Sequence, residues 1–302
     1  MLIANADRLT EIECHSSNLI NTDLSECKLL QRIDISDCTA LGTGIGAQPI
    51  LNIQNCKYLR YCDCRNTQLT AIYTMQAGGN LEEIYYPESI QTVQVTNQTY
   101  LRVLGIPYEM TEDGVEKACR NLANVQISNC NRIEYMHYPY IEGEPLNFKS
   151  IKYVQQLKLV NSLRGLNAIK FQGFNKLKTI DISSMYDMSI LGFDDMLGAD
   201  DVATLESVKL SDCPLITAIT FNVSSNDYKV EFANNTSIDL GGMQSVNTIE
   251  SNTSIKGLKT IILPTSIKKI SFVNLYGNNK SDIKNLWSCN VIITVMDLKV
   301  WT

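Results

Sequence analysis

The chain has 302 residues, of which 44% are hydrophobic and 19% are charged. This apolar content is enough to bury a real core, which excludes wholesale disorder. The formal net charge is -6, with 26 lysines and arginines against 32 acidic residues, whereas nucleic acids bind to concentrated basic faces, so we expect no binding of DNA or RNA.

One pattern of apolar residues recurs along nearly the whole chain. Its clearest form, Leu-x-x-Ile-x-Ile-x-x-Cys-x-x-Leu, occurs at Leu30, Ile33, Ile35, Cys38 and Leu41. Further copies start at Leu9, Leu59, Leu81, Leu101, Leu122, Val154, Leu177, Leu205 and Leu258, with a degenerate copy around Val230. Most starts are 20 to 23 residues apart, and a few are 28 to 32 apart. A template that returns this often predicts a repeat architecture.

The residue types explain how such a repeat would fold. Apolar side chains at positions i and i+2 of an extended stretch point to the same face. Stacking these stretches in parallel makes a sheet with a continuous apolar inner side, and the small Cys, Ser, Thr or Asn that follows fills a tight turn. One unit offers core side chains worth about 1.5–3 kcal/mol each, while ordering its residues costs about 1.5 kcal/mol per residue. Only a stack can therefore fold, and we expect residues 1–302 to form a single solenoid of about ten irregular repeats.

The cysteines fit this interior better than a disulfide framework. Cys14, Cys38 and two later cysteines, Cys130 and Cys213, recur at the same point of the pattern, so we expect reduced thiols that pack as small hydrophobes. Cys62 occupies an inward position of its repeat, as does the cysteine two residues later, and no Cys-x-x-Cys pair is present. We expect no metal and no other cofactor.

The pattern resembles the leucine-rich-repeat superfamily over nearly the whole chain. Residues 81–90 and 258–270 also carry a form close to Leu-x-x-Ile-x-Leu-Pro-x-Ser-Ile, which resembles the BspA-like class of bacterial surface repeats. The resemblance implies a right-handed superhelix with a parallel sheet on the concave face and irregular or short helical convex segments. It also implies a role in adhesion or receptor binding, on a bacterial surface or in a phage tail. The irregular spacing departs from the family.

Four stretches interrupt the pattern, at residues 107–121, 137–153, 186–204 and 233–255. The first predicts a short helix over Thr111–Arg120, because acidic residues follow a capping threonine. In solenoids such insertions form loops, often on a binding face, although ordinary loop drift explains them equally well.

The two ends of the chain also carry expectations. Residues 1–8 lack the features of a secretory leader, and no run is long and apolar enough for a membrane span. We therefore expect a cytoplasmic or virion-assembled protein rather than a secreted one. No cap precedes the first repeat at Leu9, so we expect an upstream polypeptide or a partner to cover that edge. Period-two alternation over residues 291–302 predicts a last strand.

Catalytic chemistry finds little support in the sequence. His15 and His137 are the only histidines, and neither lies in a known nucleophile motif. The glycines of Gly42–Gly46 have the wrong spacing for a dinucleotide fingerprint. We expect that the chain is not an enzyme.

The residues between the core positions predict the functional surface. They are expected to face solvent, and the candidate ligand-binding residues among them are Tyr61, Asp63, Arg65, Glu83, Tyr85, Gln126, Lys158, Asp181, Lys209 and Glu231. Tyrosine flanked by carboxylates and arginine is typical of contact surfaces and also suits carbohydrate. The sequence thus predicts a non-catalytic interaction module that binds a protein or glycan. The alternatives are a solvated face without a ligand, or a structural part that contacts other subunits of a larger assembly, such as a phage tail or virion appendage.

Overall fold

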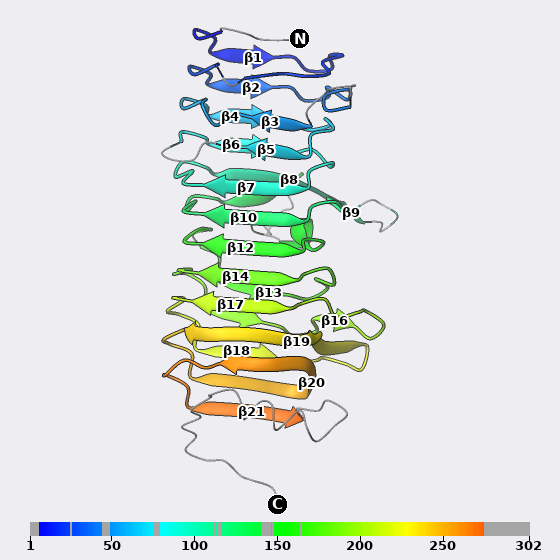
Figure 1. The fold of residues 1–302 in the computed structure, drawn as a ribbon, viewed down its shortest axis with the longest axis vertical. Helices are drawn as coiled ribbons and strands as arrows, with labels where there is room; N and C mark the ends of the chain where they lie inside the picture. The colour runs from blue at the N-terminus through cyan, green and yellow to red at the C-terminus, as the bar shows by residue number, and fades with distance from the viewer. Residues whose placement is uncertain are drawn as a thin grey trace, which may run out of the picture. The chain divides into compact units, whose positions relative to one another are not determined.

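The structure is a computed structural model, and it describes residues 6–24, 26–43, 49–74, 79–110, 113, 116–139, 146, 148–163 and 165–274. The described chain is built mostly of β-strands in parallel sheets (Figure 1). One 3₁₀ helix, Phe148–Ile151, occurs in this part of the chain, and none of its helices is long and apolar enough to cross a membrane. The chain divides into two compact units, Met1–Arg164 (unit 1) and Gly165–Thr302 (unit 2).

The first sheet of unit 1, which we name sheet A, is parallel along its main path. Its strands follow in the order β1 (Glu11–Glu13), β2 (Arg32–Asp34), β4 (Tyr61–Asp63), β6 (Glu83–Tyr85), β8 (Val103–Met110) and β11 (Tyr135–Tyr138). The register aligns Ile12, Ile33, Cys62, Ile84 and Leu104 in one row. All five side chains are buried, as the inward positions of the sequence pattern predict.

Unit 1 has a second parallel sheet, sheet B, made by the segments between the strands of sheet A. Its strands are β3 (Ile50–Asn52), β5 (Ala71–Tyr73), β7 (Thr92–Thr96), β10 (Asn124–Ser128) and β12 (Gln156–Val160). Strands β7, β10 and β12 run in the opposite direction to β1 and β2 (Figure 1). The structure thus differs from the expected single sheet with irregular or helical segments behind it. The connecting segments also alternate, as the buried Leu51 and Ile53 show, and period-two alternation favours a strand.

The helix expected over Thr111–Arg120 is wrong where the structure describes that segment. Strand β9 (Glu116–Ala118) pairs antiparallel with the end of β8, with Tyr108 opposite Ala118. Tyr108 and Cys119 are buried. Backbone bonding to an existing strand and the burial of these side chains outweigh a local capping signal, because intrinsic helix propensity is a weak preference.

Turns at the ends of the strands repeat one backbone conformation. Asn97, Asn129 and Asn161, which we name the asparagine ladder, have φ angles of 55°, 53° and 42°. The side-chain amide of Asn129 donates to Oδ1 of Asn97 at 2.8 Å, and that of Asn161 donates to Oδ1 of Asn129 at 3.2 Å. Asparagine tolerates positive φ better than most residues, so it suits these turns. Its side-chain amides also bond to one another along the ladder.

Unit 2 also contains two sheets. One has the parallel strands β13 (Ala168–Lys170), β15 (Ile190–Gly192), β18 (Ala218–Phe221), β20 (Thr248–Ile262) and β21 (Lys269–Asn274). The other has β14 (Thr179–Ser183), β17 (Ser207–Ser211) and β19 (Tyr228–Gly242), with β20 pairing beside β19 and β16 (Leu197–Gly198) antiparallel to it.

Strand β20 therefore belongs to both sheets of unit 2, and Gly257 lies just after the change, where the pairing with β19 shifts register. Thr248–Ser251 pairs with β18, whereas Ile255–Ile262 pairs with β19. Gly257 has a φ of 78°, and a Cβ atom there would overlap the carbonyl group of Phe232. Only glycine fits this corner.

The polar stretch 233–255, which we expected to be a loop insertion, lies mostly within β19 and β20. Its few apolar residues explain why. Ile238, Leu240 and Ile249 are fully buried, so their spacing selects strands despite the surrounding Asn, Ser and Thr. The strand expected over residues 291–302 lies outside the described part of the chain.

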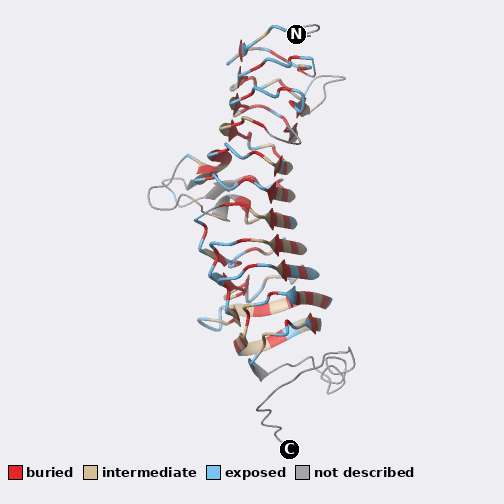
Figure 2. Cartoon of the chain, turned by 90° about the vertical axis from the view of Figure 1, so that its left-hand side faces the viewer, coloured by how far each residue is buried: buried red, intermediate tan, exposed pale blue. Residues whose placement is uncertain are grey.

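The interiors of the two units differ in composition. Unit 2 stacks Phe193 between Phe171 and Phe221, with both pairs of ring centroids 5.2 Å apart. Unit 1 instead buries thiols, such as Cys62 and Cys64, whose sulfurs lie 3.6 Å apart without a disulfide. Of the nine described cysteines, all but Cys14 are buried. Burial of Cys38, Cys130 and Cys213 agrees with thiols that pack as small hydrophobes. Figure 2 shows buried and exposed residues alternating along the strands.

Candidate functional site

Aromatic and cationic side chains line the outer surface of sheet A. The register places Arg32, Tyr61 and Glu83 in one row across β2, β4 and β6, and Asp34, Asp63 and Tyr85 in the next. The period of two along each strand is what sends these residues outward while their neighbours fill the core. We name the following set the tyrosine–arginine face: Arg32, Tyr61, Asp63, Arg65, Tyr85 and Tyr138.

The rings and guanidinium groups of this face contact one another in series. Arg32 lies over Tyr61, with its guanidinium carbon 3.9 Å from the ring centroid. The Tyr61 and Tyr85 centroids are 5.9 Å apart, and Tyr138 meets Tyr85 edge-on at 5.6 Å. Arg65 lies 4.4 Å from the centroid of Tyr138 and 5.0 Å from that of Tyr85. Cation–π and edge-to-face contacts of this kind hold the side chains in one arrangement.

A buried carboxylate fixes the centre of the face. The Asp63 side chain is only 1% exposed. It accepts hydrogen bonds from the backbone N–H of Arg65 at 3.0 Å, from the Arg65 guanidinium, and from the Tyr61 hydroxyl at 3.2 Å. A buried charge is costly unless it is paired in this way.

These contacts set the protonation of the neighbours of Asp63. The hydrogen bond to Asp63 raises the pKa of Arg65, which therefore stays charged. Burial, followed by the charge of Asp63, raises the pKa of Tyr61 to about 12. At neutral pH the centre of the face thus holds a charged guanidinium, Arg65, beside a neutral phenol, Tyr61.

A glycine makes room for the Tyr85 ring. A Cβ atom on Gly105 of β8 would lie 2.5 Å from Cδ1 of Tyr85, so the ring packs where a side chain would otherwise stand. The Tyr85 hydroxyl donates to Glu83 at 3.0 Å. Tyr85 is 8% exposed and Asp63 is fully buried. Our expectation that both would face solvent is wrong, because Arg65 lies over them and Tyr138 covers the Tyr85 ring.

The histidines take no part in the centre of this face. His15 is 55% exposed, and its Nδ1 lies 3.7 Å from Oδ1 of Asp34. Burial raises the pKa of Asp34, but hydrogen bonds from the hydroxyl and the backbone N–H of Ser36 outweigh it and hold this pKa below its usual value. His137 is fully buried in β11. The expectation of a chain without catalytic activity stays a prediction.

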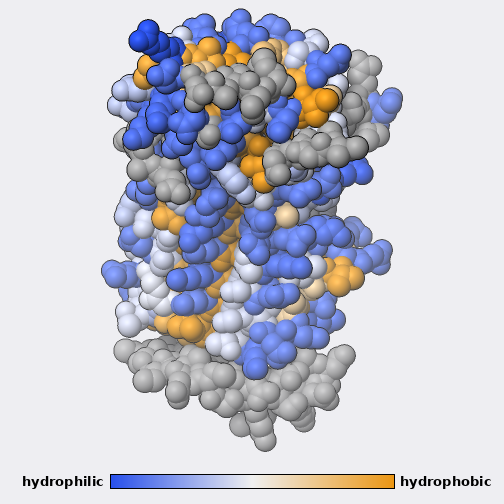
Figure 3. Space-filling model, turned by 45° about the horizontal axis from the view of Figure 1, so that its top comes forward, coloured by the Kyte–Doolittle hydropathy of each residue, from blue (hydrophilic) through white to orange (hydrophobic). Residues whose placement is uncertain are grey.

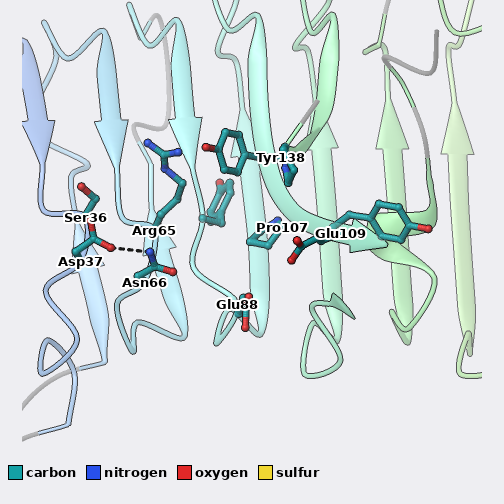
Figure 4. A pocket seen from close by; sticks show the side chains of 11 residues that line it. Ser36, Asp37, Arg65, Asn66, Glu88, Pro107, Glu109 and Tyr138 are labelled. Atoms are coloured by element: carbon teal, nitrogen blue, oxygen red, sulfur yellow. Dashed lines mark hydrogen bonds between the residues drawn. The ribbon is translucent and has the colours of Figure 1, made fainter. Parts of the chain in front are cut away.

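A pocket of about 280 Å³ adjoins the face in unit 1. Figure 4 shows Arg65 and Tyr138 beside one another in it, near the hydrogen bond that Asn66 donates to Asp37 at 2.6 Å. The turns after β2, β4 and β6 and the ends of β8 and β11 supply its lining: Ser36, Asp37, Arg65, Asn66, Tyr86, Glu88, Pro107, Tyr108, Glu109, Tyr138 and Pro139.

The charges around this pocket do not cancel. Asp37, Glu88 and Glu109 contribute carboxylates at exposed positions. The one described cation in the lining, Arg65, is already paired with the buried Asp63. Among the described lining residues, carboxylates therefore outnumber cations, and such a surface attracts positively charged groups.

The ten residues predicted from sequence do not form one surface. Tyr61, Asp63, Arg65, Glu83 and Tyr85 lie together on sheet A. The others lie elsewhere: Gln126 and Lys158 are register partners on sheet B, whereas Asp181, Lys209 and Glu231 belong to unit 2. In unit 2, Asp181 faces Lys209 across β14 and β17, and Glu231 forms an ion pair with Lys229 at 3.2 Å.

Sequence reasoning missed the residues that complete the site. Tyr138 covers Tyr85, and Glu88 and Glu109 line the pocket. The available signal was the turn-rich insertion at 137–153, which opens with His137 and Tyr138 and for which a loop on a binding face and ordinary loop drift were both left open. Within the described ranges, no group of three or more His, Cys, Asp or Glu residues is placed to hold a metal ion. Figure 3 shows a largely hydrophilic face with small apolar patches.

No protein-family model matches this chain, and no curated protein matches it either.

Proposed function

We propose that the chain is a non-catalytic recognition module that binds a protein partner at the tyrosine–arginine face and its adjoining pocket. The observation that carries this proposal is the fixed series of stacked rings and guanidinium groups beside a concave site. Tyrosine and arginine are enriched among the residues that dominate binding energy at interfaces. Because Asp63 and Gly105 already hold these side chains in place, little conformational entropy is lost when a partner binds.

We also propose that each unit winds as a leucine-rich-repeat-like solenoid with a second sheet in place of the irregular segments. The parallel register supports this. It pairs Ile33 with Cys62 and Cys62 with Ile84, which are inward residues of successive copies of the sequence pattern. Solenoids present extended surfaces to partners, which suits a recognition module.

The pocket favours a lysine or arginine side chain of the partner. Asp37 and Glu88 provide carboxylates for an ammonium or guanidinium group. The Tyr138 ring offers a surface for a second cation–π contact. An interaction of this kind weakens as ionic strength rises, because exposed charges are screened.

A random peptide library selected on the immobilised full chain tests the proposal. We expect the selected peptides to be rich in lysine and arginine and to bind less tightly in high salt. Their affinity, measured by biolayer interferometry, should fall about tenfold or more on Tyr138→Ala and on the double change Glu88→Gln/Glu109→Gln, which corresponds to about 1.4 kcal/mol.

The control removes two exposed carboxylates of unit 2, Asp200→Asn and Glu206→Gln, and should leave affinity unchanged. Peptides without basic residues, or basic peptides that bind the unit 1 variants as tightly as the parent chain, would contradict the proposal. The alternatives of a structural component of a larger assembly and of a face without a ligand stay predictions.

A further inference from the structure

Unit 1 has a second concavity, with a lining of its own, next to the residues that precede β4, β6 and β8. Its volume is about 440 Å³. We name it the tyrosine groove, and the described residues that line it are Gln31, Tyr58, Arg60, Asn80, Glu82 and Tyr100. None of them belongs to the tyrosine–arginine face or lines the pocket of about 280 Å³ that adjoins it, so the two sites can be altered separately.

The backbone sets the spacing of the groove residues. The N–H of Glu82 donates to the carbonyl of Arg60 at 2.8 Å, and the N–H of Arg102 donates to that of Glu82 at 2.7 Å. The hydrogen-bonding register of sheet A therefore continues through Arg60, Glu82 and Arg102. Tyr58, Asn80 and Tyr100 each lie two residues earlier, on neighbouring segments. Strands in a sheet are ~4.8 Å apart, so two steps place the backbone segments of Tyr58 and Tyr100 about 10 Å apart, with the segment of Asn80 between them.

Both tyrosines present their rings to solvent. Tyr58 is 54% exposed and Tyr100 is 47% exposed. The guanidinium carbon of Arg132 lies 5.4 Å from the Tyr100 centroid and limits the motion of that ring. Exposed tyrosines offer a large and rigid contact area at a low entropic cost, since each has only two side-chain torsions to fix.

The polar residues of the groove cancel in charge. Arg60 and Glu82 form an ion pair, with nitrogen–oxygen distances of 2.7 and 2.9 Å. Asn80 donates to the carbonyl of Lys57 at 3.0 Å and retains its amide oxygen, and the exposed Gln31 adds a second amide. Amides both donate and accept hydrogen bonds, which suits ligand hydroxyl groups. A groove without net charge gives no advantage to phosphates or to basic peptides.

We propose that the tyrosine groove binds a neutral oligosaccharide. A sugar ring has an apolar face of C–H groups and an edge of hydroxyls. Two adjacent sugar rings pack on Tyr58 and Tyr100, while Asn80, Gln31 and the Arg60–Glu82 pair bond to the hydroxyls between them. The spacing of the tyrosines calls for at least two sugar residues. This is a second ligand of a different class from the protein partner, on the same unit.

A glycan array probed with the labelled full chain tests this inference. It should carry neutral, sialylated and sulfated oligosaccharides and their constituent monosaccharides. We expect binding to neutral glycans of two or more residues and little change with salt. For the best neutral oligosaccharide, isothermal titration calorimetry should show about a tenfold loss of affinity for Tyr58→Ala and for Tyr100→Ala, and no binding for the double variant.

Two further variants sharpen the test. Tyr73→Ala removes a similarly exposed tyrosine of sheet B, at 39% exposure, and should leave affinity unchanged. Tyr58→Trp keeps an aromatic surface and should retain binding. Because the rings of Tyr58 and Tyr100 are exposed, their variants should melt within about 1 °C of the parent chain by circular dichroism.

The inference is overturned if no neutral glycan binds, if only charged glycans bind, or if the alanine variants bind as tightly as the parent chain. Its failure is separable from failure of the protein-binding proposal. The change Glu88→Gln/Glu109→Gln should spare glycan binding, and Tyr58→Ala/Tyr100→Ala should spare binding of the selected peptides.

Discussion

Sheets A and B of unit 1 share one backbone geometry and present different surfaces. Both are parallel along their main paths, and both bury apolar residues at alternate positions. On the outside of sheet A, unlike residues interlock: Arg32 lies over Tyr61, and Asp63 is buried beneath Arg65. On sheet B, side chains of the same type contact one another across neighbouring strands. For example, the Gln94 amide donates to the side-chain oxygen of Gln126 at 3.5 Å.

The difference shows which surface is specialised for recognition. A row of identical amides satisfies itself, and each member depends only on its two neighbours. On sheet A, each ring or charge depends on partners of another type, so a single change should disturb several contacts. We therefore expect substitutions on sheet A to cost more, and to spread further, than those on sheet B.

The largest effect is expected from removing the carboxylate at the centre of sheet A. Asp63→Ala leaves Arg65 without its partner, and breaking a buried pair costs about 3–5 kcal/mol. Because the Arg65 side chain is 29% exposed, we expect a loss of about 2–3 kcal/mol in the free energy of unfolding, measured by urea denaturation. A double-mutant cycle with Arg65→Ala should give a coupling above about 1 kcal/mol. Simple additivity of the two changes would show that the pair is not a unit.

A moderate effect is expected from filling the space under Tyr85. In Gly105→Ala the new methyl group would meet Cδ1 of Tyr85, so the ring must move away from Arg65 and Tyr138. Overpacking of this kind costs about 1–3 kcal/mol, and a partly movable ring places this case near the lower end. Urea denaturation measures the cost. Measured in a Tyr85→Ala background, the cost of Gly105→Ala should largely disappear, and a cost that persists there would place the strain elsewhere.

The smallest effect is expected on sheet B. Asn129→Ala removes two amide contacts of the asparagine ladder and places alanine at a φ of 53°. A non-glycine residue in this conformation lowers the free energy of unfolding by about 1 kcal/mol, and the loss of exposed amide contacts lowers it only slightly further. Asn129→Gly should cost less than Asn129→Ala, because glycine accepts the turn. Thermal denaturation distinguishes the two variants, and equal losses would assign the effect to the side-chain contacts.

The inward positions of the fold could be read from the sequence, because burial imposes a strict alternation. Ile33 and Cys62 fall in one buried row, as the pattern predicts. Two strands of sheet B, Ile50–Asn52 and Ala71–Tyr73, could not be read in the same way, since they are too short to separate from irregular turns. The pattern copies that start at Leu122 and Val154, by contrast, predicted β10 and β12. The helix predicted over residues 111–120 failed because a local capping signal carries no information about pairing with β8.

The candidate site was only partly predictable, for a physical reason. Period-two alternation gives the side of the sheet that Tyr61, Asp63 and Tyr85 occupy, but not what covers them. The cover of Tyr85 comes partly from Tyr138, a residue far along the chain in an irregular segment. Likewise, the pocket collects carboxylates from separate turns, Asp37 and Glu88 among them, and no spacing within one segment encodes their meeting.

The corner at Gly257 has a mechanical consequence for unit 2. Because one continuous strand hydrogen-bonds into both sheets, neither sheet can slide or detach without pulling on the other. The amides on the two sides of the corner should therefore open in a single cooperative event. A side chain at position 257 would press against Phe232 and push β20 away from β19, which would weaken this coupling.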